Sequence, residues 1–577
     1  MDHVILMPGQ AAVEAFRKRA ARRRDSLSFG ATVTTPASWL EQLWDVWGDG
    51  REVASRSQRL LGFFKALRAV PELSPSSGMA SMLLRLANEG LGTRELDVAL
   101  QGECSLEDSF GPLLGAMQEY ESVLSAAGLI DPGRAWGELA RREVVSRPTH
   151  VSVTGMEASA PLAAFCDSQP DIELEGEQPA QIAPAPDGVR VRFAFPAGGY
   201  AQPLLLCDLV KEMLEGDCSE GGIVVTARDP YAVYESMAPS LVDASIPVAF
   251  EGGVSFSATD FGRALLRMRD IATSDSVVAY CTDFLLNPFS GVSSDAAYAF
   301  DAWARANRLI TKEMCIERVR AMSGSFECFE ELISSPDASV LSGVLEDRVH
   351  SMGGVSEAYR AEQLAAVSMF RSVAEDARRL GAGMEECFAA LEGAQVPSSR
   401  VAGKGEPLVR VMEQRRAALL EPGSCSGVIA CGMTSAAYPL KERSDAATAL
   451  LEAVGLKAGY SALADARRTF AAVTALPARE LVVERCLKNE DAAETYPAAV
   501  VEEFIDLYRE DPTDADEIDN QYALPACFLD SIVERGEERL YENSAVKHGG
   551  QPALAVGEKP SLAHVGEIGR ASCRERV

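Results

Sequence analysis

The chain has 577 residues, of which 47% are hydrophobic and 24% are charged, the proportions of a globular protein rather than a disordered one. Its formal net charge of −30 argues against a protein whose whole surface is built to hold nucleic acid. The 13 cysteines contain no Cys-x-x-Cys pair and the five histidines lie far apart, so the sequence predicts no metal site and a location in the reducing cytoplasm. No apolar run approaches the roughly 20 residues that span a bilayer, so we expect no membrane partner.

The first segment predicts a strand, a turn and a helix. Val4–Met7 is an apolar run, Pro8-Gly9 is a turn signal, and helical spacing follows. Residues 1–24 hold six basic side chains against two acidic ones, so this segment carries +4 within an acidic chain. A polyanion would therefore be held locally, and not by the field of the whole protein. The basic residues are Arg17, Lys18, Arg19, Arg22, Arg23 and Arg24.

A strand over 31–34 and a capped helix are predicted next. Thr35 is a favoured N-cap residue, Pro36 is favoured at the first helical position, and Gly48 ends the helical pattern. The apolar residues recur at i, i+4 and i+8, as on the buried face of a helix. They are Trp39, Leu43 and Trp47.

The remaining chain alternates between helical and mixed segments. Residues 56–145 and 257–390 have helical spacing, and residues 168–186 are Pro-rich and polar, as in a connector. Strands are predicted in "THVSVTGMEA", "VRVRFAF", "GGIVVTA", "SGVIACGM" and "ARELVVERC", and most of them are followed by helical patterns. Strands that alternate with helices indicate parallel sheets, so we predict an α/β protein with two parallel-sheet domains, each with a helical insertion.

These patterns also set domain boundaries. The predicted segments are a first domain at 1–192 with its insertion at about 56–145, a second domain at 193–275 and 396–535 with its insertion at 276–395, and a connector at 536–566. The last eleven residues, "EIGRASCRERV", match the in-frame translation of a common sequencing adapter. We therefore expect 567–577 to be an artefact and a further domain to follow Gly566; a natural basic tail is the alternative.

Several blocks, in the same order, resemble superfamily 1 DNA helicases and, more narrowly, the AddB subunits of bacterial AddAB helicase–nucleases, relatives of RecBCD. The blocks are "RFAFPAGGYAQPLLLCDLVKEML", "TDFLLNPFSGVSSDAAYAF", "GVIACGMTSAAYPL" and "ARRTFAAVTALPARELVV". Gly432, Tyr438 and Pro439 match the turn after the third block in that family. The resemblance covers residues 1 to about 535 and implies that both sheets belong to RecA-like domains.

The chain departs from the family's nucleotide site. "MPGQAAVEAF" takes the place of a phosphate-binding loop but has no second glycine, no lysine and no Ser/Thr after it. Thr154-Gly155 stands where a motor has the acidic pair that holds Mg²⁺. In this comparison Arg228 and Arg479 are relics of nucleotide contacts, with Arg479 displaced by about one residue. The resemblance therefore implies an inactive motor fold, and we predict no catalytic residue.

The resemblance further implies a function and partners. Family members act with an AddA-type motor subunit on DNA double-strand ends in recombinational repair, and ATP is bound by that partner. Many also carry a C-terminal nuclease domain with Mg²⁺ and an iron–sulfur cluster, which here would follow Gly566. Two alternatives remain: an architectural protein that stabilises its partner without touching DNA, and an ATPase with an unorthodox site.

Five residues are candidates for contact with single-stranded DNA. Arg17, Arg22 and Arg24 could contact phosphates, and a solvated helix face opposite Val13 and Phe16 is the favoured alternative. Thr34 and Thr35 match a motor segment that contacts the DNA backbone, although helix capping explains Thr35 equally well. Trp39 could stack on a base, or it could belong to the core. For Arg228 a structural role is the alternative.

Overall fold

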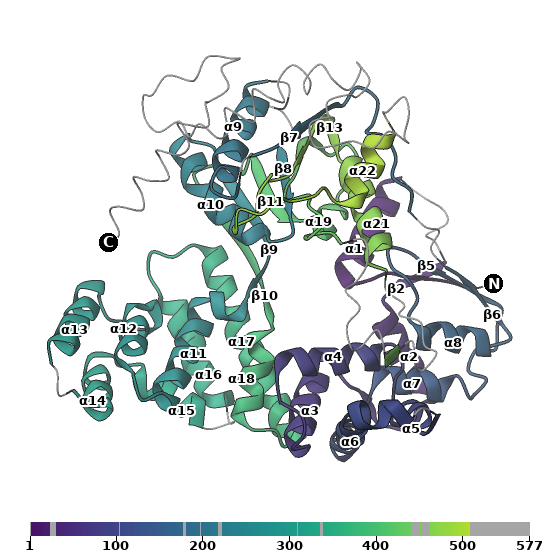
Figure 1. Ribbon diagram of the computed structural model, residues 1–577, viewed down its shortest axis with the longest axis horizontal. Helices are drawn as coiled ribbons and strands as arrows, with labels where there is room; N and C mark the ends of the chain where they lie inside the picture. The colour runs from purple at the N-terminus through teal and green to yellow at the C-terminus, as the bar shows by residue number, and fades with distance from the viewer. Residues whose placement is uncertain are drawn as a thin grey trace. The chain divides into compact units, whose positions relative to one another are not determined.

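The computed structural model describes residues 2–23, 30–102, 104–176, 180–196, 198–216, 218, 222–307, 310–334, 338–439, 450–451 and 461–507. Arg24, the predicted connector at 536–566 and the adapter-like end lie outside these ranges. Within them the protein is α/β, with parallel sheets and many helices, as predicted (Figure 1). Contacts divide the chain into two compact units: unit 1 is Met1–Pro179, Phe250–Val401 and Lys441–Ser461, and unit 2 is Ala180–Ala249, Ala402–Leu440 and Ala462–Val577.

Unit 1 contains a four-stranded parallel sheet of order β2-β1-β5-β6. Its strands are β1 (Asp2–Leu6), β2 (Ala31–Thr34), β5 (Thr149–Val153) and β6 (Ile172–Glu175). Strand β6 corrects the prediction that 168–186 is a connector throughout. Its sequence Ile-Glu-Leu-Glu alternates partly buried apolar residues with exposed acidic ones, which suits an edge strand with one face toward the core.

Three helices cover one face of this sheet and build its core. They are α2 (Pro36–Trp47), α7 (Pro132–Leu139) and α8 (Ala160–Ser168). Helix α2 starts as predicted, because the Thr35 side chain accepts a hydrogen bond from Ser38 N at 3.1 Å. The cap explains how a short local sequence fixes the point at which the chain leaves β2.

The rest of the N-terminal part of unit 1 is helical, as predicted for 56–145, with one small exception. The two-residue strands β3 (Glu52–Val53) and β4 (Leu129–Ile130) form a parallel pair beside the helices. The helices of this part are α1 (Gln10–Arg23), α3 (Arg56–Ala69), α4 (Ser77–Asn88), α5 (Thr93–Gly102) and α6 (Cys104–Ala126).

The second helical part of unit 1 also follows the prediction. Its helices are α11 (Asp260–Thr273), α12 (Val278–Leu286), α13 (Ser294–Ala306), α14 (Lys312–Met322), α15 (Phe326–Ser334), α16 (Ala338–Ser351), α17 (Glu357–Leu380) and α18 (Met384–Glu392). Short 3-10 turns at Phe256–Ala258 and Pro288–Ser290 join them. Phe261 centres an aromatic cluster, with ring centroids of Phe289 and Phe370 at 5.7 and 5.9 Å.

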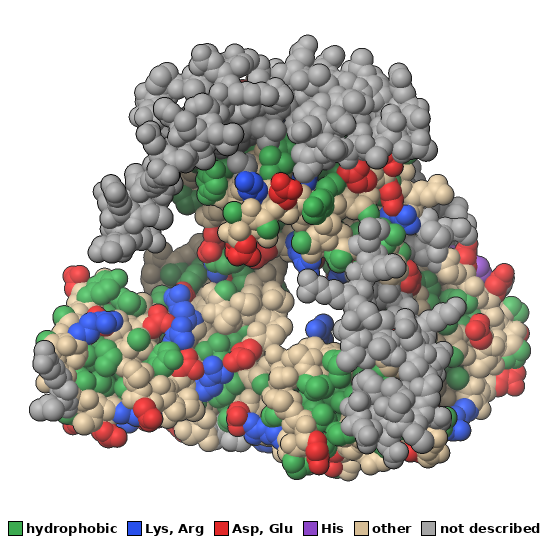
Figure 2. Space-filling view, viewed as in Figure 1, with side chains coloured by type: hydrophobic (Ala, Val, Ile, Leu, Met, Phe, Trp, Pro, Cys, Tyr) green, Lys and Arg blue, Asp and Glu red, His purple; other side chains and the backbone are tan. Residues whose placement is uncertain are grey.

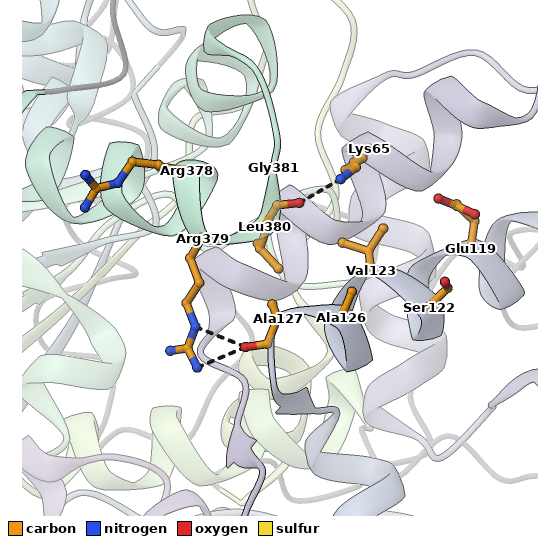
Figure 3. A pocket seen from close by; sticks show the side chains of 10 residues that line it. All are labelled: Lys65, Glu119, Ser122, Val123, Ala126, Ala127, Arg378, Arg379, Leu380 and Gly381. Carbon is orange, nitrogen blue, oxygen red and sulfur yellow. Dashed lines mark hydrogen bonds between the residues drawn. The ribbon is translucent and has the colours of Figure 1, made fainter.

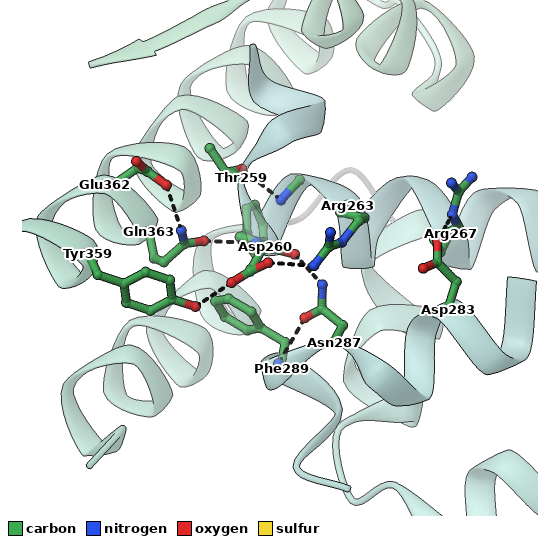
Figure 4. Close-up of polar contacts among 12 residues, drawn as sticks. Thr259, Asp260, Arg263, Arg267, Asp283, Asn287, Phe289, Tyr359, Glu362 and Gln363 are labelled. Atoms are coloured by element: carbon green, nitrogen blue, oxygen red, sulfur yellow. Dashed lines mark hydrogen bonds and ion pairs between the residues drawn. The ribbon is translucent and has the colours of Figure 1, made fainter. Parts of the chain in front are cut away.

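Polar side chains of α17 fix the start of α11 (Figure 4). Gln363 accepts a hydrogen bond from the backbone N–H of Phe261 at 2.9 Å, and the Tyr359 hydroxyl donates to Asp260 at 2.6 Å. Asn287 closes the same region by donating to the carbonyl of Asp260 at 2.9 Å. The entry of the chain into the helical part is thereby tied to its longest helix.

Unit 2 contains the parallel strands β11, β8, β12, β13 and β7 of a sheet whose full order is β10-β9-β11-β8-β12-β13-β7. Strands β9 and β10 continue across the sequence boundaries between the units. The strands are β7 (Arg190–Ala194), β8 (Ile223–Ala227), β9 (Val248–Ser255), β10 (Gln395–Ala402), β11 (Val409–Glu413), β12 (Cys425–Ala430) and β13 (Pro477–Glu484).

Helices pack along this sheet in two groups. Helix α10 packs on β8 and β11, whereas α21 packs on β12 and β13. The helices of unit 2 are α9 (Gln202–Glu215), α10 (Pro230–Asp243), α19 (Gln414–Ala417), α21 (Ala462–Thr474) and α22 (Ala499–Asp506). None of the helices in the described ranges is both long and apolar enough to cross a bilayer.

Candidate functional site

The order of strands identifies one candidate site in unit 1. The chain leaves β1 toward β2 and leaves β5 toward β6, on opposite sides, so β1 and β5 flank the topological switch point of the sheet. Open α/β sheets place ligands in the crevice outside the carboxyl ends of such strands. The loops that begin at Met7 and Thr154 therefore meet there, and Thr154 N donates to the Leu6 carbonyl at 2.9 Å.

These two loops are the segments that the sequence compared with a phosphate loop and a metal-binding acidic pair. Pro8 has no N–H group, so it removes one of the backbone donors that a phosphate would need. Gly155 has a φ of +79°, and a Cβ added there would lie 3.4 Å from Pro8 Cδ. The two turns are thus neighbours, and the apolar ring of Pro8 faces the second loop.

Two basic candidates for DNA contact fall on the described part of α1. Arg17 is exposed and its Nη2 donates to the Val33 carbonyl at 2.7 Å, which links α1 to β2. Arg22 is exposed at the end of the same helix. Arg24 lies outside the described residues. The hydrogen bond to Val33 therefore gives Arg17 a structural role, whether or not it also contacts phosphate.

The other two candidates are buried. Thr34 ends β2 with 8% of its surface exposed, and its carbonyl accepts from Met7 N at 3.0 Å. Trp39 is 6% exposed, and its ring centroid lies 5.6 Å from that of Trp136 and 5.8 Å from that of Phe165. A ring must present a face to stack on a base, so these contacts favour the alternative in which Trp39 belongs to the core.

Unit 2 has a switch point of its own, between β8 and β12. The chain leaves β8 toward β9 through α10 and leaves β12 toward β13 through α21. Arg228 follows β8 directly, and its Nη1 donates to the carbonyl of Ala437 in the loop after β12. The side chain that resembles a nucleotide-contacting arginine is thus placed at the carboxyl edge, where it ties two loops together.

The structure does not bring Arg479 to the same place. The register pairs Glu480 with Gly427, and Gly427 with Ile223, so Arg479 lies level with the start of β8. Arg228 lies five residues further along β8, about 16 Å along the strand direction. The two predicted relics therefore sit at opposite ends of the sheet. The sequence could not show this, because it depends on the strand register.

Glu484 is a polar residue of this edge that sequence reasoning missed. It ends β13, is fully buried, and accepts hydrogen bonds from Gly432 N and Gln202 Nε2, both at 2.8 Å. Burial raises the pKa of its carboxyl group, and these hydrogen bonds oppose the rise. Glu484 thereby connects the loop after β12 with the first turn of α9. The only sequence signal was an acidic residue after three apolar ones in a strand.

Unit 1 also contains an open cavity of about 370 Å³ between α3, α6 and the end of α17 (Figure 3). Lys65 Nζ donates to the Leu380 carbonyl at 2.7 Å, and Arg379 donates twice to the Ala127 carbonyl at 3.2 and 3.3 Å. Cations suit the carboxyl ends of helices, where carbonyl groups lack partners. The Arg378 side chain points away from the other lining side chains in Figure 3. We therefore interpret this cavity as the seam between two helix ends.

Neither the charges on the face in Figure 2 nor the metal-binding side chains of the described residues mark a further site. On the face shown in Figure 2, basic and acidic side chains are interspersed over helices α11–α18. Within the described ranges, no three His, Cys, Asp or Glu side chains gather in a way that could hold a metal ion.

No protein-family model matches the chain, and no curated protein sequence matches it.

Proposed function

We propose that the chain is a motor-like scaffold that does not hydrolyse ATP and that holds DNA within a cytoplasmic helicase–nuclease acting on double-strand ends. The order of strands and helices supports it, because two parallel sheets with helical segments between them are compatible with two RecA-like domains. An AddA-type partner would supply ATP-driven movement along the DNA.

The observation that carries the proposal is the pair of loops at the β1/β5 switch point. A phosphoryl-transfer site works almost entirely by positioning and by electrostatic stabilisation, through a lysine, a metal-binding acid and backbone donors. Here the first loop contributes Pro8 and Gly9, and the second contributes Thr154 and Gly155. Neither Pro8-Gly9 nor Thr154-Gly155 carries a charge, and the only charged residue of the loop between β5 and α8, Glu157, follows two positions after Gly155. The first turn has no lysine to hold a phosphate, so we expect this edge to have no measurable affinity for ATP.

The second sheet supports the same conclusion. Arg228 is engaged with the Ala437 carbonyl, and Arg479 lies at the far end of its strand. An arginine stabilises a transferring phosphoryl group only when it can reach it. Arg228 would thus act as a structural residue, and Arg479 would be a relic out of reach of a nucleotide, in a fold that keeps the shape of a motor.

DNA contact is proposed for the exposed basic end of α1. Helix α1 carries Arg17, Lys18, Arg19, Arg22 and Arg23, of which Arg17, Lys18 and Arg22 are exposed. Because the chain as a whole is acidic, binding through this segment would be local and would weaken strongly with salt.

Fluorescence anisotropy of the full chain with a tailed duplex tests this proposal. Two or three phosphate contacts predict an affinity that falls about ten- to fortyfold between 50 and 200 mM salt. Arg22→Gln should reduce the salt slope by about one. Arg141→Gln, which removes an exposed arginine outside α1, is the matched control and should change neither quantity.

Two outcomes would reject the proposal. DNA-stimulated ATP hydrolysis by the purified chain would show that the switch-point loops act on nucleotide after all. Absence of DNA binding at 50 mM salt, combined with stable binding to an AddA-type subunit, would favour the purely architectural role.

A further inference from the structure

Strand β8 carries a buried hydroxyl in an otherwise apolar row. The register places Thr226 between Met412 of β11 and Ala430 of β12, on the face that packs against α21 and α22. Thr226 is fully buried, and its Oγ1 has no hydrogen-bond partner among the described residues. A buried hydroxyl without a partner is unfavourable, since it gives up its bonds to water on folding.

A second buried polar group, the Gln414 amide, lies beyond Thr226 at the carboxyl ends of the same strands. Gln414 follows β11, and its Nε2 donates to Met433 Sδ at 3.0 Å in the loop after β12. Because β8 lies between β11 and β12, this contact spans the carboxyl end of β8. Gln414 is 3% exposed, and its Oε1 has no partner within the part of the chain that is described.

A third group comes from the same loop. Tyr438 packs against the apolar cluster that contains Met412, Ala430 and Met433. Its hydroxyl is buried and, like the other two atoms, makes no hydrogen bond to any described residue. Burial raises the pKa of Tyr438, so the hydroxyl stays protonated and can donate.

We propose that one internal water molecule bridges Thr226 Oγ1, Gln414 Oε1 and the Tyr438 hydroxyl at the carboxyl ends of β8, β11 and β12. The chemistry fits: the amide oxygen accepts a hydrogen bond, and each hydroxyl can donate or accept. Buried waters typically make about three hydrogen bonds to polar groups that are otherwise unpaired. This inference does not depend on the proposed function.

The water would couple three neighbouring strands at the switch point of unit 2. It would also hold Tyr438 in the loop whose Ala437 carbonyl receives the Arg228 guanidinium. The loop after β12 would then be held at two neighbouring residues, by Arg228 at Ala437 and by the water at Tyr438.

The sign of a stability change tests the bridge. Thr226→Val keeps the shape and removes the hydroxyl. If the hydroxyl binds water, this variant and Tyr438→Phe should each lower the apparent melting temperature of the full chain by about 1–3 °C. Thr474→Val is the control, since Thr474 is 2% exposed and its hydroxyl donates to the Ala471 carbonyl at 3.1 Å. Because both hydroxyls would then lose a hydrogen bond, Thr226→Val and Thr474→Val should both lower the melting temperature.

The double variant and a crystal structure complete the test. Thr226→Val with Tyr438→Phe should cost less than the sum of the two single changes, because both lose the same water. A density peak at about 2.6–3.2 Å from all three atoms is expected in a crystal structure of the full chain. A rise in melting temperature for Thr226→Val, additive shifts, or a dry site in the crystal would overturn the proposal.

Discussion

The carboxylate of Glu362 is fully buried in α17 and receives two hydrogen bonds from the guanidinium of Arg400 in β10, at 2.7 and 2.8 Å. Ser398 of the same strand donates to this carboxylate as well. A bidentate pair with an additional donor is the geometry in which a buried charge is well compensated. The pair joins the longest helix of unit 1 to the strand by which the chain leaves the helical part.

Glu362→Gln should lower the free energy of unfolding by about 2–4 kcal/mol, because it removes the buried carboxylate that forms a bidentate pair with Arg400. Urea unfolding of the full chain measures the change. Glu357→Gln is the matched control: its pair with Arg360 lies on the same helix, and the Glu357 side chain is 88% exposed. An exposed pair contributes about 0–1 kcal/mol. Equal effects of the two substitutions would contradict this assignment.

Asp131 supports a second prediction, in the N-terminal part of unit 1. Its carboxylate accepts from Arg59 Nε at 2.8 Å and from the Tyr120 hydroxyl at 2.7 Å, and it caps α7 through Gly133 N at 2.8 Å. Asp131→Asn keeps the cap but removes the anion beside a buried arginine, so we expect a loss of about 2–4 kcal/mol. Tyr120→Phe removes one neutral donor and should cost about 1 kcal/mol. Urea unfolding distinguishes the two, and a larger loss for Tyr120→Phe would show that the ion pair is not the main contribution.

Local signals in the sequence predicted the elements better than their placement. Thr35 and Pro36 determine the start of α2 by themselves, so that prediction is confirmed. Strand β6 was missed because it is short and lies in a polar, Pro-rich stretch, where its pairing with β5 and the packing of Ile172 and Leu174 on the core stabilise it. The separation of Arg228 from Arg479 also depends on pairing between strands distant in sequence. For the same reason, neither the Glu484 hydrogen bonds nor the buried row around Thr226 could be read from spacing.

Glu484 makes stability depend on pH. Its pKa is raised above the ordinary value of 4.5, chiefly by burial, so the folded state binds its proton more tightly than the unfolded state. Its contribution is therefore fully present below the unfolded pKa and is lost as the pH rises through the folded pKa. Glu484→Gln should flatten this part of the stability profile, measured by urea unfolding from pH 4 upward. Thr474→Val, which removes a buried hydrogen bond but no titratable group, is the control and should leave the slope unchanged.

The buried cysteines predict resistance to thiol reagents. Burial raises the pKa of Cys281 and of Cys387 to about 12, so at pH 8 almost none of either is the reactive thiolate. Native protein treated with a maleimide at pH 8 should leave both unlabelled by peptide mass spectrometry, and labelling should become complete in urea. Cys486, which is only partly buried, provides the internal comparison for access, although burial raises its pKa too. Rapid native labelling of Cys281 or Cys387 would mean that α12 or α18 opens far more readily than its packing indicates.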